Sequence, residues 1–409
     1  MESAQTSAKK KKKNWPLALA GTVLLCLVAV CAYFGIKNLL RITCPEIRIG
    51  VILPLSGSRA QFGLAMKRGM EMAIEDINAS GKLKKKLVCL FTDDRSDPEG
   101  AAKAASRLVR RDDITILIGS YSNLCTLKVS DIAEKAKIPQ ITPISSGTEI
   151  STRGCKWVFR TNAPSAHYAL ALIDFLGNAA EIDRIALLNE TDNAGIDFAN
   201  CVKSYAREMK CSIVYEKGFA YKTADFRPVI REAMKQKPQA FVISAHIEDA
   251  LQIMRDARKL KIRMKAIAGM GSGFSLPDFI TQGKKDAELT FSAVQWNPQV
   301  KWPGSREFAK KFKTRFGSYP DEHSANLYAA VQVVAACYIH RPFHTRESLR
   351  NALRSLDTET IFGRIKFENF ENYTNQNSHY PLIQQVQKGV RVIVWPRDLR
   401  NGKPVFPTR

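Results

Sequence analysis

Small polar side chains follow three apolar stretches in the first half of the sequence, and they could bind a small molecule by hydrogen bonds. These residues are Ser56 after the run 47–53, Ser122 and Asn123 after 114–118, and Ser145 and Ser146 after 139–143. If the apolar runs are parallel strands, their carboxyl ends share one edge of the sheet, which is where open α/β sheets bind ligands. Hydroxyl and amide groups donate and accept hydrogen bonds there. The pattern therefore predicts a polar binding cleft.

The segment from Ser122 onward carries a second signal, because it leads directly into a predicted helix over 125–136. The free N–H groups and the dipole of a helix start favour a carboxylate. An alternative is that Ser122 and Asn123 only cap the helix, and for Ser145 and Ser146 the alternative is an ordinary serine turn. Both alternatives remain open at this point.

Catalytic motifs are missing from the sequence. It contains no G-x-S-x-G elbow, no Walker loop and no H-E-x-x-H pair. The glycine-rich segment 269–273 lacks the spacing of a nucleotide-binding loop, and His246 is interpreted as a cleft or packing histidine. The nine cysteines show no C-x-x-C spacing, so we expect no zinc site, and seven of them lie outside the apolar N-terminal segment. Since seven is odd, at least one thiol is expected to be free or to pair with another chain. We expect no enzyme, metal or cofactor.

The order of apolar and amphipathic segments predicts two α/β lobes with parallel sheets. The first series has strands at 47–53, 87–91, 114–118 and 139–143, and helices at 61–78, 98–110 and 125–136. The second has strands at 184–188, 212–216, 240–244 and 265–268, and helices at 194–209, 226–235 and 248–259. The remainder has helices at 305–316, 324–339 and 346–355, and strands at 365–367, 382–385 and 390–394. Two tandem series predict two sheets with a cleft between them.

The N-terminus predicts export. Residues 1–14 are polar and basic, and 15–36 carry no charge, which is long enough for a transmembrane helix. Positive charge before the segment favours a cytoplasmic tail with the remaining chain on the other side. We expect a signal anchor in the cytoplasmic membrane; the alternative is a signal peptide cleaved before Tyr33.

The net charge of +23 has two interpretations. Lys9–Lys13 account for five positive charges, and the rest are spread along the chain without a nucleic-acid motif. One interpretation is a solvated basic surface, and the other is attraction to anionic lipid or to an acidic ligand. We expect no nucleic-acid partner.

Several sequence stretches together resemble one known family. They are IGVILPLSGSRAQFG from Ile49, AIEDINASG, DDRSDPEGA, ILIGSYSN, PQITPISSGTEI, VFRTNAPS, FGRIKF and PLIQQVQKG. In this order they resemble the branched-chain amino acid-binding proteins of ABC importers, which have the type I periplasmic binding fold. The match covers roughly Ile47 to Trp395. The resemblance implies that the chain crosses between lobes near Asn162, Gln295 and Asn375. Lobe 1 would then contain 46–162 with 296–375, and lobe 2 would contain 163–295 with 376–409.

The resemblance also implies a set of ligand contacts. An aromatic ring at Phe62 would stack over the ligand, the alternative being a core aromatic. The Ile144 carbonyl would accept from a ligand ammonium, and the Ser146 hydroxyl would bind its carboxylate. In the second lobe the binding loops correspond to Asn193 with Ala194 and to Met270 with Gly271. The complete predicted set is Ser56, Phe62, Tyr121, Ser122, Asn123, Ile144, Ser145, Ser146, Asn193, Ala194, Met270 and Gly271.

The second lobe departs from the family pattern. Ala194 stands where the family usually has an aromatic residue, and the segment 269–272 has no acid where amino-acid binders carry a glutamate. Asp192, His246 and Glu248 are acidic or basic, but none is at the matching place. Burying an ammonium without a counter-charge is costly. We therefore expect a carboxylate or amide without a free amine.

The favoured function is the extracytoplasmic solute receptor of an ABC importer, with a permease as partner. The alternative is a membrane-tethered sensory module of the same fold that reports to a membrane partner. A gene repressor of this fold would need an N-terminal helix-turn-helix, where this sequence has an apolar segment.

Overall fold

The computed structural model describes residues 46–111, 113–270, 273–340 and 345–407, with the backbone of Ser272 and six residues between Val23 and Ala32. Glu46–Arg409 forms one compact unit. Apart from those six residues, the predicted tail 1–14 and membrane segment 15–36 lie outside the described part. Among the described residues, no helix has the length and hydropathy needed to cross a membrane.

The first sheet has eight strands in the order β11-β12-β13-β5-β4-β3-β1-β2. Their bounds are β1 Glu46–Leu53, β2 Lys86–Asp93, β3 Ile114–Gly119, β4 Gln140–Thr142, β5 Val158–Arg160, β11 Asp357–Thr360, β12 Gly363–Phe370 and β13 Tyr373–Asn377. β1 pairs in parallel with both β2 and β3, so it is an interior strand next to the edge strand β2. Ile49, Val51 and Ile52 of β1 are fully buried. A nearly continuous apolar run is what a parallel strand covered on both faces requires.

The second sheet has seven strands in the order β15-β14-β10-β9-β8-β6-β7. Their bounds are β6 Arg184–Glu190, β7 Ser212–Phe219, β8 Ala240–Ser244, β9 Ala266–Met270, β10 Phe291–Val294, β14 Leu382–Gln387 and β15 Val390–Trp395. β6, β7, β8, β9 and β10 run parallel to their neighbours among one another.

The prediction of purely parallel sheets is wrong, since each sheet also contains antiparallel pairs. β11, β12 and β13 form an antiparallel series in the first sheet, and β10, β14 and β15 form one in the second. For β14 and β15 the reason is the short connection: two residues, Lys388 and Gly389, join these strands, and both have positive φ. Such a two-residue turn fits an antiparallel hairpin, whereas parallel neighbours need a long crossover.

Helices connect the parallel strands. Their bounds are α2 Ala60–Ala79, α3 Pro98–Val109, α4 Asn123–Ala136, α5 Glu149–Thr152, α6 Ser165–Asp174, η1 Phe175–Ala179, α7 Asn193–Glu208, α8 Arg227–Lys235, α9 Ile247–Lys259, α10 Ser272–Ser275, α11 Pro277–Gly283, η2 Lys284–Asp286, α12 Ser305–Phe316, α13 Glu322–His340 and α14 Arg346–Arg354. α13 packs along α2 at the first sheet. The predicted strand–helix alternation is therefore present in both halves.

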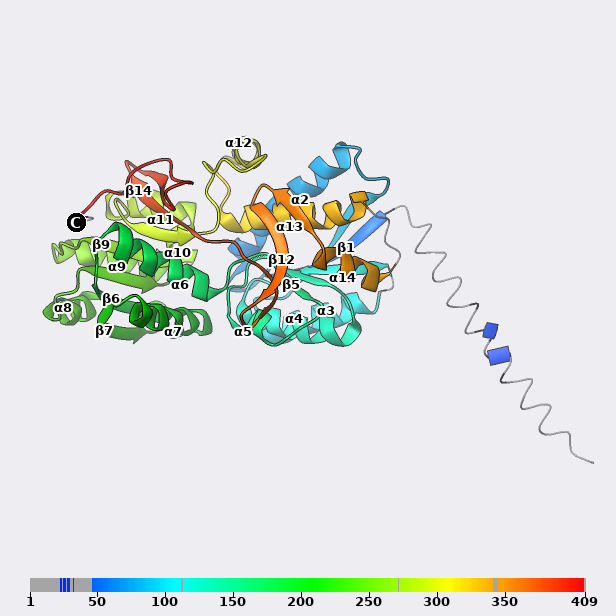
Figure 1. The fold of residues 1–409 in the computed structure, drawn as a ribbon, viewed down its shortest axis with the longest axis horizontal. Coiled ribbons are helices and arrows are strands. Elements are labelled where there is room, and N and C mark those ends of the chain that lie inside the picture. Colours follow the sequence, from blue (N-terminus) through cyan, green and yellow to red (C-terminus); the bar gives the residue numbers. More distant parts are fainter. Residues whose placement is uncertain are drawn as a thin grey trace, which may run out of the picture. The chain divides into compact units, whose positions relative to one another are not determined.

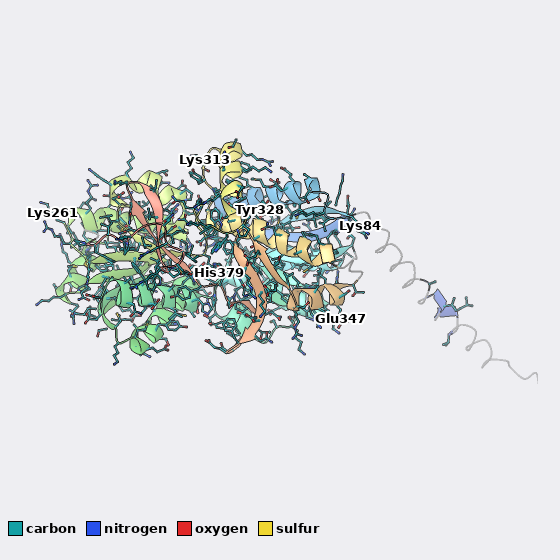
Figure 2. The ribbon with its side chains drawn as sticks, turned by 45° about the horizontal axis from the view of Figure 1, so that its top comes forward. Lys84, Lys261, Lys313, Tyr328, Glu347 and His379 are labelled. Carbon is teal, nitrogen blue, oxygen red and sulfur yellow. The ribbon has the colours of Figure 1, made fainter. Side chains whose placement is uncertain are left out.

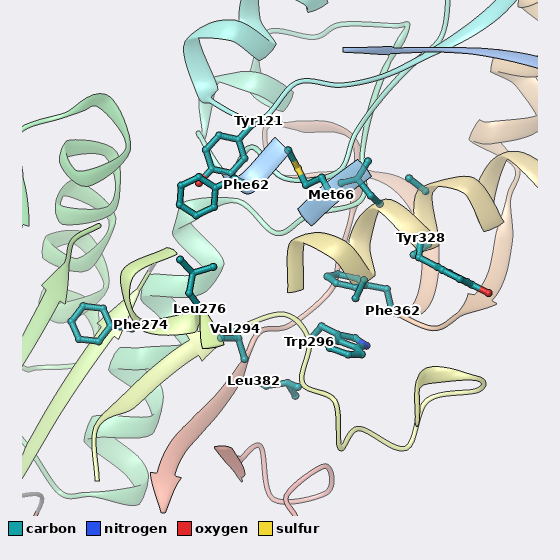
Figure 3. Packing of buried hydrophobic residues seen from close by; sticks show 14 of the residues in the cluster. Phe62, Met66, Tyr121, Phe274, Leu276, Val294, Trp296, Tyr328, Phe362 and Leu382 are labelled. Atoms are coloured by element: carbon teal, nitrogen blue, oxygen red, sulfur yellow. The ribbon is translucent and has the colours of Figure 1, made fainter. Parts of the chain in front are cut away.

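The chain passes between the two sheets after β5, after β10 and after β13. Each sheet is consequently assembled from segments that are distant in the sequence, as the colours of Figure 1 show. Two α/β lobes result, which confirms the predicted architecture. Apolar side chains continue through the region where the chain passes: Phe62 and Met66 of α2 belong to one cluster with Val294 and Trp296 (Figure 3).

Basic side chains lie on the outside of both lobes. Lys84, Lys261 and Lys313 are exposed and extend from the periphery in Figure 2. Many of the charges lie in exposed ion pairs or alone at the surface, for example Arg364 with Asp357. This distribution agrees with the solvated-surface interpretation of the net charge.

One buried cation connects β5 to β13 and to the loop after β4. The Arg160 guanidinium donates to Gln376 Oε1 at 2.5 Å, to the Gly147 carbonyl at 2.6 Å and to Ser151 Oγ at 2.6 Å. Burial lowers the pKa of Arg160 to about 10, so the side chain is still protonated at neutral pH. Its hydrogen bonds fix the end of the serine-containing loop that the sequence assigned to ligand binding.

Replacing this cation tests its contribution to stability. We expect Arg160→Met to lower the free energy of unfolding by about 3 kcal/mol, because buried acceptors lose their donor. Urea denaturation measures the change. Arg153→Met is the control: Arg153 is an exposed partner of Asp131, and surface pairs contribute less than about 1 kcal/mol. Equal effects of the two substitutions would contradict the assignment.

Candidate functional site

A cavity of about 280 Å³ opens between the carboxyl ends of the parallel strands of the two lobes. The predicted site residues that line it are Tyr121, Ser122, Asn123, Ile144, Ser145, Ser146, Asn193, Ala194 and Met270. They come from the loops after β3 and β4, from the starts of α4 and α7, and from the end of β9. Strand-end loops from both sheets therefore meet at one place, as expected for open α/β sheets.

Two predicted residues do not line this cavity, and a third lies outside the described residues. The Ser56 hydroxyl donates to Asp93 Oδ2 at 2.5 Å at the surface. Phe62 is buried and stacks on Tyr121, with ring centroids 5.0 Å apart. The core-aromatic alternative describes Phe62, whose ring packs beside Tyr121 in Figure 3. Of the two residues, Tyr121 is the one that lines the cavity. Gly271 is outside the described part of the chain.

The start of α4 faces the cavity. Ser122 caps the helix by accepting from the Cys125 N–H at 3.3 Å, so the capping alternative holds for its hydroxyl. The N–H groups of Asn123 and Leu124 belong to the first turn, where a helix leaves donors without intrahelical acceptors. Together with the helix dipole they favour an anionic group at this end of the cavity.

Hydrogen bonds fix the loop after β4 against α4. The Ser145 hydroxyl lies 2.9 Å from the Tyr121 carbonyl and 2.5 Å from Thr126 Oγ1. The Gly147 N–H donates to Asn123 Oδ1 at 3.0 Å. Ser145 therefore acts within the protein, and Ser146 is the loop serine whose hydroxyl has fewer partners, with Ser165 Oγ at 3.3 Å.

The carbonyl of Ile144 is already engaged. The side-chain amide of Asn162 donates to it, and the Tyr168 hydroxyl donates to Asn162 Oδ1 at 3.2 Å. The resemblance assigned this carbonyl to a ligand ammonium. An acceptor that holds an internal amide has reduced capacity for such a cation.

In the second lobe the buried Glu190 pairs with the half-buried His246. Glu190, the last residue of β6, accepts from the His246 backbone N–H at 2.6 Å, and its other oxygen lies 2.6 Å from His246 Nδ1. Arg59 Nη1, from the first lobe, lies 2.9 Å from His246 Nε2. Because a guanidinium only donates, Nε2 accepts, and Nδ1 carries the proton that His246 donates to Glu190.

Glu190, Asp192 and His246 bring potential metal-ligand atoms within 4.8 Å of one another. In this structure, however, these three side chains form hydrogen bonds within the protein. Both ring nitrogens of His246 are engaged, Asp192 caps α7 by accepting from the Gly195 N–H at 2.7 Å, and a guanidinium lies in contact with the ring. A positive charge at that position opposes a second cation.

Hydrogen bonds also connect the lobes across the cleft. Besides Arg59 to His246, Asn123 Nδ2 donates to Asn193 Oδ1 at 3.3 Å. The Thr148 N–H donates to Asp197 Oδ2 at 3.2 Å. Polar groups of both lobes are thus close enough to contact the same small molecule.

The start of α13 places Glu322 and His323 in the cavity lining. Burial raises the pKa of Glu322, which accepts from the Gln295 N–H at 2.9 Å. His323 Nδ1 lies 3.3 Å from Asp321 Oδ2. Burial acts to lower the pKa of His323, but the hydrogen bond and charge of Asp321 outweigh it and raise the pKa. The pKa of Asp321 is lowered: burial opposes this shift, and His323 outweighs it.

The two shifts define a pH window. The raised pKa of His323 adds stability below its unfolded value of 6.5, and the lowered pKa of Asp321 adds stability above its unfolded value of 3.8. We expect Asp321→Asn to lower the unfolding free energy by about 3 kcal/mol between pH 3.8 and 6.5. Thermal or urea unfolding at pH 5.5 and pH 9 measures it. The loss should shrink at the higher pH; a loss that grows with pH would contradict the assignment.

Sequence reasoning missed several residues that line the cavity. They are Arg59, Asn162, Tyr168, Glu190, Ser244, Glu322, Asn326 and Phe362. Arg59 follows β1 in the same loop as Ser56, and Glu190 and Ser244 end β6 and β8, so extending the strand-end rule to every residue of these loops would have found them. Glu322, Asn326 and Phe362 come from the last third of the chain, and no local pattern marks them.

A sequence description of the periplasmic binding protein family matches residues 46–390. The chain belongs to this family. The resemblance to branched-chain amino acid-binding proteins is also confirmed: the Leu/Ile/Val-binding protein homolog 8 of Brucella abortus (strain 2308) is 25% identical over 383 residues, covering 88% of this chain and 93% of the relative. Members of this family bind solutes and are not enzymes.

Solved structures show the same fold at low sequence identity. The substrate-binding protein LivJ of Streptococcus pneumoniae, in complex with isoleucine, has a TM-score of 0.74 and 21% identity, covering 88% of this chain and all of that one. A solute-binding protein of an ABC transporter from Rhodopseudomonas palustris, in complex with 3,4-dihydroxybenzoic acid, has a TM-score of 0.73 and 19% identity, covering 84% and 94%. At these identities the likeness concerns the fold alone.

Proposed function

We propose that this protein is the extracytoplasmic substrate-binding protein of an ABC importer of the branched-chain amino acid type. It binds a small amino acid, carboxylate or amide between its lobes. One observation carries the proposal: the start of α4 and the serine loop of one lobe face the strand ends of the other across a single cavity. A helix start and hydroxyl groups suit a carboxylate or amide oxygen.

The contacts favour a ligand without a free amine. No acid occupies the family's glutamate position, and the Ile144 carbonyl already accepts from Asn162. Glu190 and Asp192 are committed to His246 and to the α7 cap. The fold itself admits either class, since the related structures hold isoleucine in one case and a dihydroxybenzoic acid in the other.

Closure is the proposed mechanism. A ligand that contacts both lobes stabilises the closed state over the open one by its extra affinity for the closed state. A permease that recognises the closed form would then receive only loaded protein. The bonds from Arg59 to His246 and from Asn123 to Asn193 are contacts that closure completes.

The second candidate is a membrane-tethered sensor of the same fold. The observation in its favour is the uncharged segment 15–36 behind Lys9–Lys13, which would act as an anchor in the cytoplasmic membrane. A permanently tethered module reports ligand to a membrane partner instead of delivering it. Co-purification of the full chain from membranes with a permease would favour the importer, and with a signalling protein the sensor.

Titration with leucine, isoleucine and valine tests the ligand class. We expect no binding tighter than about 1 mM for any of them, because Glu190, Asp192 and Glu322 already accept internal hydrogen bonds and no acid stands at the family's glutamate position to pair with the ammonium. Isothermal calorimetry gives the affinities. Mass spectrometry of small molecules released from the denatured protein should identify a carboxylic acid or an amide. Tight binding of any of the three amino acids would refute the ligand class while leaving the receptor function intact.

A further inference from the structure

Arg59 is a cation of the cavity whose charge is not neutralised by the residues that the structure describes. Within that part of the chain its guanidinium forms no ion pair; it bonds the neutral Nε2 of His246 at 2.9 Å and lies over the Tyr121 ring at 5.7 Å. A guanidinium has five N–H donors, so donors remain for a further acceptor. Arg59 is partly buried, and it lies at the N-cap of α2, next to the cavity.

The partner that holds Arg59 explains why its charge persists. A carboxylate at the place of His246 Nε2 would cancel the positive charge, whereas a neutral ring nitrogen fixes the guanidinium without cancelling it. Glu190 holds the ring in this orientation through Nδ1 at 2.6 Å. The Tyr221 ring packs edge-on against the His246 ring, with centroids 5.5 Å apart.

The positive charge of Arg59 also lies near the start of α4. Its guanidinium contacts Tyr121, and the next residue, Ser122, caps that helix. Guanidinium donors and free helix N–H groups therefore approach the same part of the cavity. Both favour an anion, and a planar guanidinium matches a carboxylate by two parallel hydrogen bonds.

We propose that Arg59 is the charge partner of the ligand and that the cleft selects an organic monocarboxylate that lacks an ammonium group. This deepens the proposed function and rests on it. His246 and Glu190 are positioning residues that act through Arg59. Because Arg59 belongs to one lobe and His246 to the other, the anion site is complete only when the lobes approach each other.

The other charged groups of the cavity limit the ligand to a single negative charge. Glu190 accepts two N–H bonds from His246, Asp192 caps α7, and Glu322 accepts from the Gln295 N–H. The carboxylates of Glu190 and Asp192 would repel a second anionic group, and the acceptor positions of all three acids are partly used. A dicarboxylate is therefore disfavoured.

Calorimetry with a matched set of probes tests the proposal. The probes are 4-methylpentanoate, its amide and leucine, which share one carbon skeleton, together with benzoate and benzamide. At least one carboxylate should bind at least 10-fold more tightly than its amide, and 4-methylpentanoate more tightly than leucine. Arg59→Gln should weaken carboxylate binding by about 10- to 100-fold and amide binding by less than about 3-fold. Arg255→Gln, on the exposed face of α9, is the control and should change neither.

The outcomes separate the two proposals. If an amide or leucine binds as tightly as the matched carboxylate, or if Arg59→Gln binds the carboxylate as tightly as the wild type, the anion assignment is overturned and the receptor function stands. If no probe binds, both are rejected for these ligand classes. Should Arg59→Gln unfold, the carboxylate-to-amide ratio of the wild type still decides the question.

Discussion

The site depends on one constraint: parallel strands end together, and the helices that follow them begin with unpaired N–H groups. In this protein two sheets turn those ends toward each other, so that the start of α4 in one lobe faces the end of β6 in the other. Backbone N–H groups are costly to bury without a hydrogen-bond partner, and a ligand that accepts their hydrogen bonds removes this cost. The chain passes between the two sheets three times, and in the proposed mechanism these passages act as the hinge about which the two surfaces separate.

The acidic and basic side chains of the cleft differ in the partners that hold them. Acidic groups in the cleft are held by internal donors, as Glu190 is by His246, while Arg59 is held by a neutral acceptor. The buried Arg160 of β5 is likewise held by neutral acceptors: it donates to the Gln376 side-chain amide, the Gly147 carbonyl and the Ser151 hydroxyl, and to no carboxylate among the described residues. In the proposed ligand class, the Arg59 guanidinium is the group of the cleft that favours a negatively charged ligand.

Sequence patterns predicted the parts of the structure that local physics determines. The buried run of β1 and the serine loops after β3 and β4 were predicted because their signals lie within a few residues. The strands 365–367, 382–385 and 390–394 were predicted and are present in β12, β14 and β15, but their antiparallel pairing was not. The contributions of Glu322 and Phe362 were not predicted either, because they depend on chain passages that bring distant segments together. A local pattern also does not determine which way a side chain on a helix points. From the sequence the Phe62 ring could face the cleft or the core, and in the structure it packs against Tyr121 in the core.

The central claim is that the two lobes close on a small molecule held between them. Small-angle X-ray scattering tests it most directly on protein that has been unfolded, freed of small molecules and refolded, measured before and after the released small-molecule fraction is returned. The account predicts a smaller radius of gyration once that fraction is restored. An unchanged radius, with the small molecule demonstrably bound, would contradict closure of the cleft.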